Sequence, residues 1–322
     1  MRIGVSACLL GEPVRFDAGH KRDPFLVEVF GRHVEWVPVC PEVEAGFGTP
    51  RDPMRLLLAE PRARARGEHF GPGSLRLIVT RTGDDVSDRL TRYAKRKVEQ
   101  LSRERLSGFV LKKDSPSCGM ERVKVYTPNG TPERAGRGLF AEALMARYPA
   151  LPVEEEGRLA DPRLRENFIE RVFAYRRLRD LFDARWSMGD LVAFHTAHKL
   201  TLMAHSPSAY RELGRLVAQG TASPALSSEY EALFMRALTI VATPARHANV
   251  LQHMLGYFKK SLDRDARAEL AAIIDDHRLG LVPLVVPITL MRHHVRRQKI
   301  AYLEGQTYLA PHPRELSLRN HV

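Results

Sequence analysis

This chain of 322 residues has few cysteines and no long apolar run. Its three cysteines are an odd number and none forms a C-x-x-C pair, which excludes a disulfide framework. No apolar stretch approaches the roughly 20 residues that a membrane-spanning helix needs. Too few residues precede Cys8 to form a signal peptide. We therefore expect a soluble, cytoplasmic protein with no membrane partner.

Acidic residues are the scarcer charge, with 38 Asp and Glu against 50 Lys and Arg. An excess of positive charge favours a polyanionic partner, because phosphate contacts dominate the affinity of proteins for nucleic acids. Plain solubility is an equally good explanation of such a surface. The charge balance therefore indicates nucleic acid as a candidate partner and does not decide the matter.

The length predicts two domains of about 150 residues each. Over the first of them, short runs rich in Val, Ile and Leu alternate with helical or loop stretches. We expect strands within 1–8, 33–40, 75–80 and 108–113, and a helix over 87–106 whose apolar residues share one face. This order predicts an α/β domain over 1–155, Rossmann-like, with a mostly parallel sheet.

Beyond a proline-punctuated connector, strand signals become scarce. Apolar residues recur at three-to-four spacing over 163–183, 187–219, 226–241, 245–260 and 263–276. Ser187, Ser206 and Asp263 are candidate helix starts. We expect an all-α helical domain of five to seven helices over 156–322.

Each cysteine lies where a predicted strand ends: Cys8 after the first, Cys40 after the second and Cys118 past the fourth. Ligands bind outside the carboxyl ends of strands in an open parallel sheet, so we expect the three thiols to converge. Three buried structural cysteines are the plain alternative. Converging thiolates could hold a structural zinc ion with a fourth ligand, or an iron–sulfur cluster with one open iron.

Polar side chains next to the cysteines are candidates for acid–base chemistry. Glu42, two residues after Cys40, can serve as a base or proton shuttle. Ser115 and Ser117 supply hydroxyl groups beside Cys118. Serine next to proline is also a common turn cap, so a structural role for both hydroxyls stays open.

Four stretches together resemble the thiouracil desulfidase family, over roughly residues 1–150: SACLLGEPVRFDAGHK, VCPEVEAGFGTPRDPMRL, RLIVTRTGDDVSD and LKKDSPSCGM. The resemblance implies a [4Fe-4S] cluster on Cys8, Cys40 and Cys118 and removal of sulfur from a thiocarbonyl nucleobase. It places the acidic residue of the family on Glu42 and the serine on Ser115. Where members read Gly-Gly-Leu, this chain has Ala-Gly-Phe at 45–47, which bears on the shape of the substrate pocket.

The second half resembles a helical family of unknown function, and such fusions resemble enzymes that convert 4-thiouridine in tRNA to uridine. The resemblance implies tRNA as partner and a non-redox hydrolysis of the C=S bond. In it Glu42, with Ser115 in its hydrogen-bond chain, activates water, and sulfur leaves to a sulfide acceptor or as free hydrosulfide. Two alternatives stay open. The substrate could be free thiouracil or a small thionucleoside, or the cysteines could hold zinc in a non-catalytic RNA-binding module.

Basic residues of the second half are candidates for contacts with tRNA. Three of them recur at i, i+4 and i+7, and Tyr302 and Tyr308 nearby suit stacking on unpaired bases. A solvated basic face is the alternative explanation. The candidate residues are Lys199, Arg292, Arg296, Arg297 and Lys299.

Overall fold

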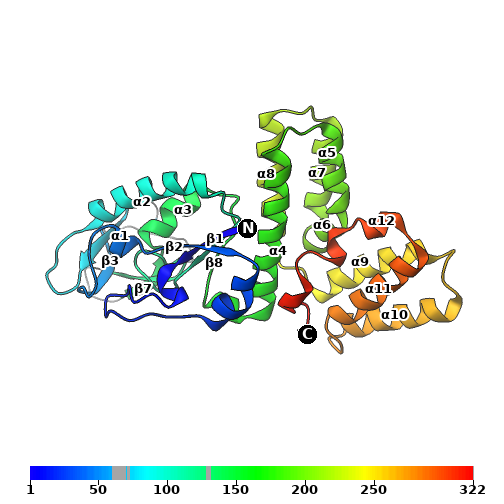
Figure 1. The fold of residues 1–322 in the computed structure, drawn as a ribbon, viewed down its shortest axis with the longest axis horizontal. Helices are drawn as coiled ribbons and strands as arrows, with labels where there is room; N and C mark the ends of the chain where they lie inside the picture. Colours follow the sequence, from blue (N-terminus) through cyan, green and yellow to red (C-terminus); the bar gives the residue numbers. More distant parts are fainter. Residues whose placement is uncertain (60–69, 71–72, 128–131, 322) are drawn as a thin grey trace. The chain divides into compact units, whose positions relative to one another are not determined.

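The computed structural model describes residues 1–59, 70, 73–127 and 132–321. The chain divides into two compact units, Met1–Ala160 and Asp161–Val322 (Figure 1). The first unit combines helices with β-sheet and the second is helical, which confirms the predicted fold class.

Four parallel strands form one sheet of this unit, and three of them are each followed by a cysteine. Their order in the sheet is β2 (Glu35–Val39), β1 (Arg2–Ser6), β5 (Phe109–Leu111) and β8 (Val153–Glu155). Strand β1 is central, and β5 packs closely on it because Gly4 has no side chain. A Cβ at Gly4 would lie 2.2 Å from the ring of Phe109. The predicted parallel sheet is therefore present, with β1 flanked by the strands that precede the other two cysteines.

The predicted strand at 75–80 belongs to a second sheet rather than to the parallel one. This sheet has the order β4 (Leu75–Val79), β3 (Met54–Leu58), β6 (Val123–Tyr126) and β7 (Pro132–Gly136). Its outer pairs are antiparallel and its central pair is parallel. Including 75–80 in the parallel sheet was wrong, because an apolar run identifies a strand without identifying its partner.

The described residues of the first unit also form three α-helices: α1 (Pro41–Glu44), α2 (Ser87–Leu101) and α3 (Leu139–Arg147). The apolar face predicted for the helix at 87–106 is buried on α2, which confirms that periodicity. Helices α2 and α3 pack against each other. On α3, the ring of Phe140 lies 5.8 Å from that of Phe109, so α3 also covers the parallel sheet.

The described part of the second unit contains nine α-helices, more than expected. The run 187–219 is three helices, because the helical backbone is interrupted at His198 and because Ser206, followed by Pro207, caps a new helix. Ser187 and Asp263 are N-caps as predicted, with a capping box at Ser187. The helices are α4 (Pro162–Phe182), α5 (Met188–Ala197), α6 (Lys199–His205), α7 (Pro207–Gln219), α8 (Pro224–Leu238), α9 (Pro244–Leu255), α10 (Arg264–Arg278), α11 (Val285–Gln298) and α12 (Ala301–Glu304).

Within the residues that the structure describes, every helix is too short or too polar to cross a lipid bilayer.

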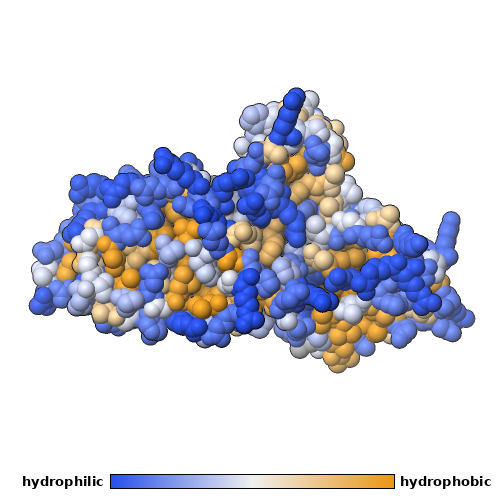
Figure 2. Space-filling view, viewed as in Figure 1, coloured by the Kyte–Doolittle hydropathy of each residue, from blue (hydrophilic) through white to orange (hydrophobic). Residues whose placement is uncertain are grey.

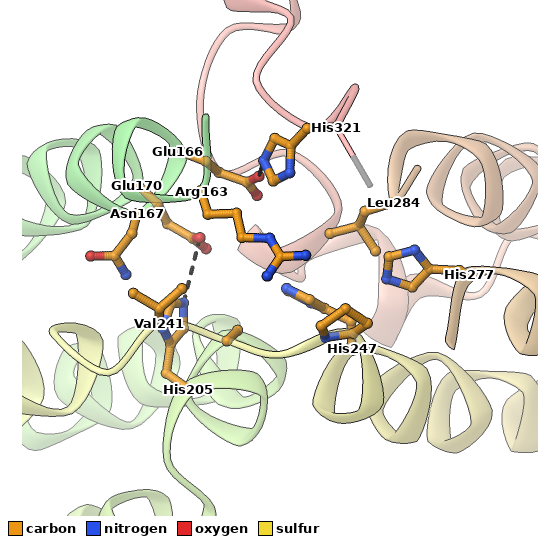
Figure 3. Close-up of a pocket in the computed structure, with 12 residues that line it drawn as sticks. Arg163, Glu166, Asn167, Glu170, His205, Val241, His247, His277, Leu284 and His321 are labelled. Atoms are coloured by element: carbon orange, nitrogen blue, oxygen red, sulfur yellow. Dashed lines mark hydrogen bonds and ion pairs between the residues drawn. The ribbon is translucent and has the colours of Figure 1, made fainter. Parts of the chain in front are cut away.

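A group of charged side chains is buried inside the helical unit (Figure 3). Arg319 donates from Nε to Glu166 on α4 at 3.2 Å and lies 3.8 Å from Glu170 one turn later. His321 contacts Glu166 at 2.8 Å, and His205 at the end of α6 lies 3.5 Å from Glu170. Burial alone would raise the pKa of Glu170, but the hydrogen bond and charge of His205 and the charge of Arg319 lower it well below its ordinary value. These contacts tie both the C-terminal segment and α6 to α4.

Replacing Glu170 with glutamine removes a buried charge and leaves Arg319 and His205 with a weaker partner. We expect Glu170→Gln to lower the free energy of unfolding by about 3–5 kcal/mol, measured by urea unfolding. The control Glu229→Gln, at an exposed position of α8, is expected to change it by less than about 0.5 kcal/mol. Because the folded-state pKa of Glu170 is lowered, its contribution is present above the unfolded-state pKa and is lost as the pH falls through the folded-state value. Equal stability of the two variants at pH 7 would contradict this account.

Candidate functional site

A cleft of about 460 Å³ opens at the carboxyl ends of the parallel strands of the first unit. Its walls come from the segments that follow β1, β2 and β5, which are far apart in the chain. All the site residues predicted in this unit line it: Cys8, Cys40, Glu42, Ser115 and Cys118. The cleft therefore lies where a parallel sheet ordinarily binds its ligand.

The three thiols reach the cleft because their strands are neighbours. Cys8 lies in a short 3₁₀ turn directly after β1, and Cys40 separates β2 from α1. Cys118 lies in the loop between β5 and β6. All three are free thiols, with Cys8 and Cys118 buried and Cys40 partly buried.

Burial keeps these thiols protonated in the metal-free protein. It raises the pKa of Cys8 to about 11, against the opposing charge of Lys112, and it raises the pKa values of Cys40 and Cys118 as well. Negative charge on Cys8 or Cys40 raises the pKa of Cys118 further, so the thiols lie close enough to influence one another. A metal centre bound here would take thiolates and release protons.

The loop that carries Cys118 is fixed by the first turn of α3. The Phe140 N–H, which has no partner inside its own helix, donates to the carbonyl of Ser117 at 3.0 Å. The Ser115 hydroxyl accepts from the Cys118 N–H at 3.1 Å. Gly138 allows this close approach, because a Cβ there would lie 2.4 Å from the Ser117 carbonyl oxygen. The backbone on the N-terminal side of Cys118 is thus fixed by hydrogen bonds from α3 to the Ser117 carbonyl and from the Cys118 N–H to the Ser115 hydroxyl.

The carboxylate of Glu42 is buried and paired with Arg51. Nε of Arg51 donates to Oε2 of Glu42 at 2.8 Å, and Nη2 donates to the same oxygen. Nη1 of Arg51 donates to the carbonyls of Val14 and Gly48, at 3.0 and 2.9 Å. Only 11% of the Glu42 side chain and 7% of the Arg51 side chain are exposed, so each charge depends on the other.

Arg51 was not predicted as a site residue. It lies nine residues after Glu42 in a loop rich in glycine and proline, and it carries no motif of its own. A buried carboxylate needs a cation close to it, and the nearness of Arg51 to Glu42 in the sequence is the one feature that could have suggested this arginine.

Ser117 contacts Glu42 directly, and Ser115 lies one step further away. Oγ of Ser117 donates to Oε1 of Glu42 at 2.6 Å, and Oγ of Ser115 lies 3.0 Å from that of Ser117. An ionised carboxylate only accepts, so the Ser117 proton points to Glu42 and the Ser115 proton points to Ser117. Oγ of Ser117 also lies 3.8 Å from Sγ of Cys118. The hydroxyls therefore form a directed chain from Ser115 through Ser117 to Glu42.

The donor set of the cleft suits a soft metal centre, because thiolates are its preferred ligands. Among the described residues, no group of three or more His, Cys, Asp or Glu side chains could hold a single metal ion. A [4Fe-4S] cluster binds each thiolate to a different iron, so its ligands need not meet at one point. By donor chemistry, Cys8, Cys40 and Cys118 fit such a cluster.

The basic residues predicted to bind nucleic acid lie on separate elements of the helical unit. Lys199 begins α6, with its Nζ 6.0 Å from the ring centre of Tyr210 and 5.9 Å from that of Tyr302. Figure 2 shows hydrophilic side chains gathered over the region of α11. That helix carries Arg292, Arg296 and Arg297.

Two details of that prediction need correction. Lys299 is the C-cap of α11 in the left-handed conformation, so it does not continue the helix face of Arg292 and Arg296. Tyr308 is fully buried and its hydroxyl pairs with His247 at 2.9 Å, so its ring has no face for a base. Tyr302 is partly buried and stacks on Tyr257, with ring centres 5.1 Å apart.

Comparisons with known proteins divide the chain in the same way. The family described as 2-thiouracil desulfurase matches residues 3–156, and a family described as a protein of unknown function, DUF1722, matches residues 199–313. The uncharacterized protein YbgA of Escherichia coli (strain K12) is 34% identical over 161 residues, which are 49% of this chain and 95% of YbgA. The uncharacterized protein YbbK of Bacillus subtilis (strain 168) is 30% identical over 140 residues, which are 44% of this chain and 87% of YbbK.

One solved structure is also similar. It is TudS, a [4Fe-4S]-dependent thiouracil desulfidase, with 30% sequence identity. The match covers 49% of this chain and 93% of TudS, with a TM-score of 0.36.

Replacing Arg51 with methionine leaves the Glu42 carboxylate buried without a cation. We expect Arg51→Met to lower the free energy of unfolding by about 3–5 kcal/mol in urea unfolding, whereas Arg103→Met, at an exposed position, changes it little. Adding Glu42→Gln to Arg51→Met is expected to recover part of the loss, because it removes the stranded charge. A double variant less stable than Arg51→Met alone would rule out this pairing as the cause.

Proposed function

The chain belongs to the 2-thiouracil desulfurase family, and we propose that it is a [4Fe-4S]-dependent desulfidase that converts 4-thiouridine in tRNA to uridine. The observation that supports the chemistry best is the convergence of three thiols, an ion-paired carboxylate and two linked hydroxyls in one cleft. The net charge of +12 and the basic residues of α11 support the polyanionic substrate.

Cys8, Cys40 and Cys118 would hold the cluster, which when bound supplies a Lewis-acidic iron with an open position for the thiocarbonyl sulfur. The side chains of the chain supply proton transfer. Ser115, the more exposed of the two hydroxyls, can take a proton from cleft water as its own proton passes through Ser117 to Glu42. Arg51 pairs with that carboxylate and orients it. Water replaces the sulfur at the ring carbon, sulfur leaves as hydrosulfide to an acceptor or to solvent, and no electrons are transferred.

A base within folded tRNA must leave its stack to reach the buried thiols, at a cost of a few kcal/mol. Contacts with the phosphate backbone can offset that cost without reading sequence. Arg296, Arg297 and Lys299 are exposed in the helical unit and are available for such contacts. In this proposal the first unit holds the base and the second holds the RNA.

The proposed cluster is tested by purification without air. We expect roughly four iron and four sulfide ions per chain, a brown colour, and release of sulfide from 2-thiouracil and from tRNA that contains 4-thiouridine. Cys118→Ser is expected to abolish both the iron content and the activity. A colourless wild-type protein with stoichiometric zinc would support the alternative of a structural zinc site in an RNA-binding module.

The acid–base assignment is tested in the same assay. Glu42→Gln is expected to keep the iron and to lower kcat about 10²–10⁴-fold, whereas the surface variant Glu99→Gln keeps full activity. Ser117→Ala is expected to lose more activity than Ser115→Ala, because only Ser117 donates directly to Glu42. A greater loss in Ser115→Ala would reverse that order and assign the working hydroxyl to Ser115.

The choice of tRNA over a free base is tested by reversing charge on the helical unit. A variant with Arg296→Glu, Arg297→Glu and Lys299→Glu is expected to raise KM for thiolated tRNA at least about tenfold, with turnover of 2-thiouracil unchanged. The matched control reverses three exposed cations elsewhere in the unit: Arg185, Arg236 and Lys260. A wild-type protein that turns over 2-thiouracil and leaves tRNA untouched would favour the small-thiobase alternative.

A further inference from the structure

The cleft contains an exposed aromatic ring that the proposed chemistry does not use. Phe16 follows β1, lines the cleft and is 40% exposed. Among the large apolar side chains that are exposed in the described residues, it is the one that borders the thiols. A ring left uncovered by its own chain in this position is available to a ligand.

The backbone of Phe16 is held in place by the same arginine that holds Glu42. The Arg51 N–H donates to the Phe16 carbonyl at 2.9 Å, and its guanidinium donates to the Val14 carbonyl at 3.0 Å. The ring is supported from one side by Arg15, whose guanidinium carbon lies 5.3 Å from the ring centre. Arg15 is itself paired with Asp17 at 3.4 Å. The exposed ring is therefore preorganised rather than a loose surface group.

The remaining walls of the cleft present more apolar than polar surface, and their polar side chains include Glu42, Ser115 and Ser117. Apolar walls with convergent polar groups are the usual surroundings of a small organic ligand. A planar heteroaromatic ring can lie against an aromatic side chain and still present one edge to polar groups. Such stacking is worth about 1–3 kcal/mol per base and tolerates different ring substituents. The apolar side chains that line the cleft with Phe16 include Val14, Val39, Pro41, Pro53, Met54 and Pro116.

We propose that Phe16 is the base-stacking residue of this cleft, with its ring packed on the face of the thiolated pyrimidine. The proposal deepens the proposed function and rests on it for the identity of the base. It assigns recognition to the flat face of the ring, which a free base and a base flipped out of RNA share. Because a stack forms in the ground state as well as in the transition state, Phe16 contributes to binding rather than to the chemical step.

The test measures binding of 2-thiouracil and of uracil to the anaerobically purified full chain by calorimetry, alongside steady-state sulfide release. Phe16→Ala is expected to raise Kd and KM about 5–150-fold, with kcat changed by less than about threefold. Phe16→Trp is expected to stay within about threefold of the wild type, and Phe16→Leu, which keeps apolar bulk without a π-face, to weaken binding. Leu281→Ala, at an exposed apolar position of the helical unit, is the matched control.

Two results would overturn the assignment: unchanged binding and KM in Phe16→Ala, or wild-type affinity in Phe16→Leu. Failure of the proposed function has a different signature. A wild-type protein that binds 2-thiouracil in a Phe16-dependent way and releases no sulfide would uphold the stacking residue and reject the desulfidase. A wild-type protein that releases sulfide with the same KM as Phe16→Ala would uphold the desulfidase and reject the stacking residue. A wild-type protein that binds neither base would reject the stacking residue.

Discussion

The buried ion pair between Arg51 and Glu42 is the contact on which the geometry of the cleft depends. Neither side chain could remain charged and buried without the other, because desolvating an unpaired ion costs several kcal/mol. Nη1 of the guanidinium donates to the carbonyls of Val14 and Gly48. Arg51 therefore connects the carboxylate on α1, the segment after β1 and its own loop. A residue with no part in bond breaking thus determines where the polar and aromatic groups of the cleft lie.

Local patterns predicted the parts of the molecule that depend on neighbours in the chain. The cysteines were found at strand ends because apolar runs mark buried strands and parallel strands share a carboxyl edge. The face of α2 and the N-caps at Ser187 and Asp263 follow from periodicity and capping chemistry within a few residues. These features needed no knowledge of tertiary contacts.

Long-range pairing accounts for what the sequence did not reveal. Glu42 and Ser117 are 75 residues apart, and no periodicity connects them. The strand at Leu75–Val79 pairs with β3 in a second sheet, although its composition suits either sheet. In the helical unit, the spacing of Lys299 suggested a helix face, but the backbone turns left-handed there and ends the helix. Tyr308 is likewise buried rather than exposed, and its hydroxyl is hydrogen-bonded to His247, which is 61 residues away in the chain.

The spread of the three cysteines along the chain also determines when a metal cofactor can arrive. Cys8 and Cys118 meet only after β5 has paired beside β1, so the nascent chain contains no local ligand set. In a zinc finger, by contrast, closely spaced ligands let the metal drive folding. A cluster on these three thiols, as proposed, would therefore be received by a chain that has already folded, through the open cleft. Under that proposal, delivery of the cluster is a step of maturation, with the folded apoprotein as its acceptor.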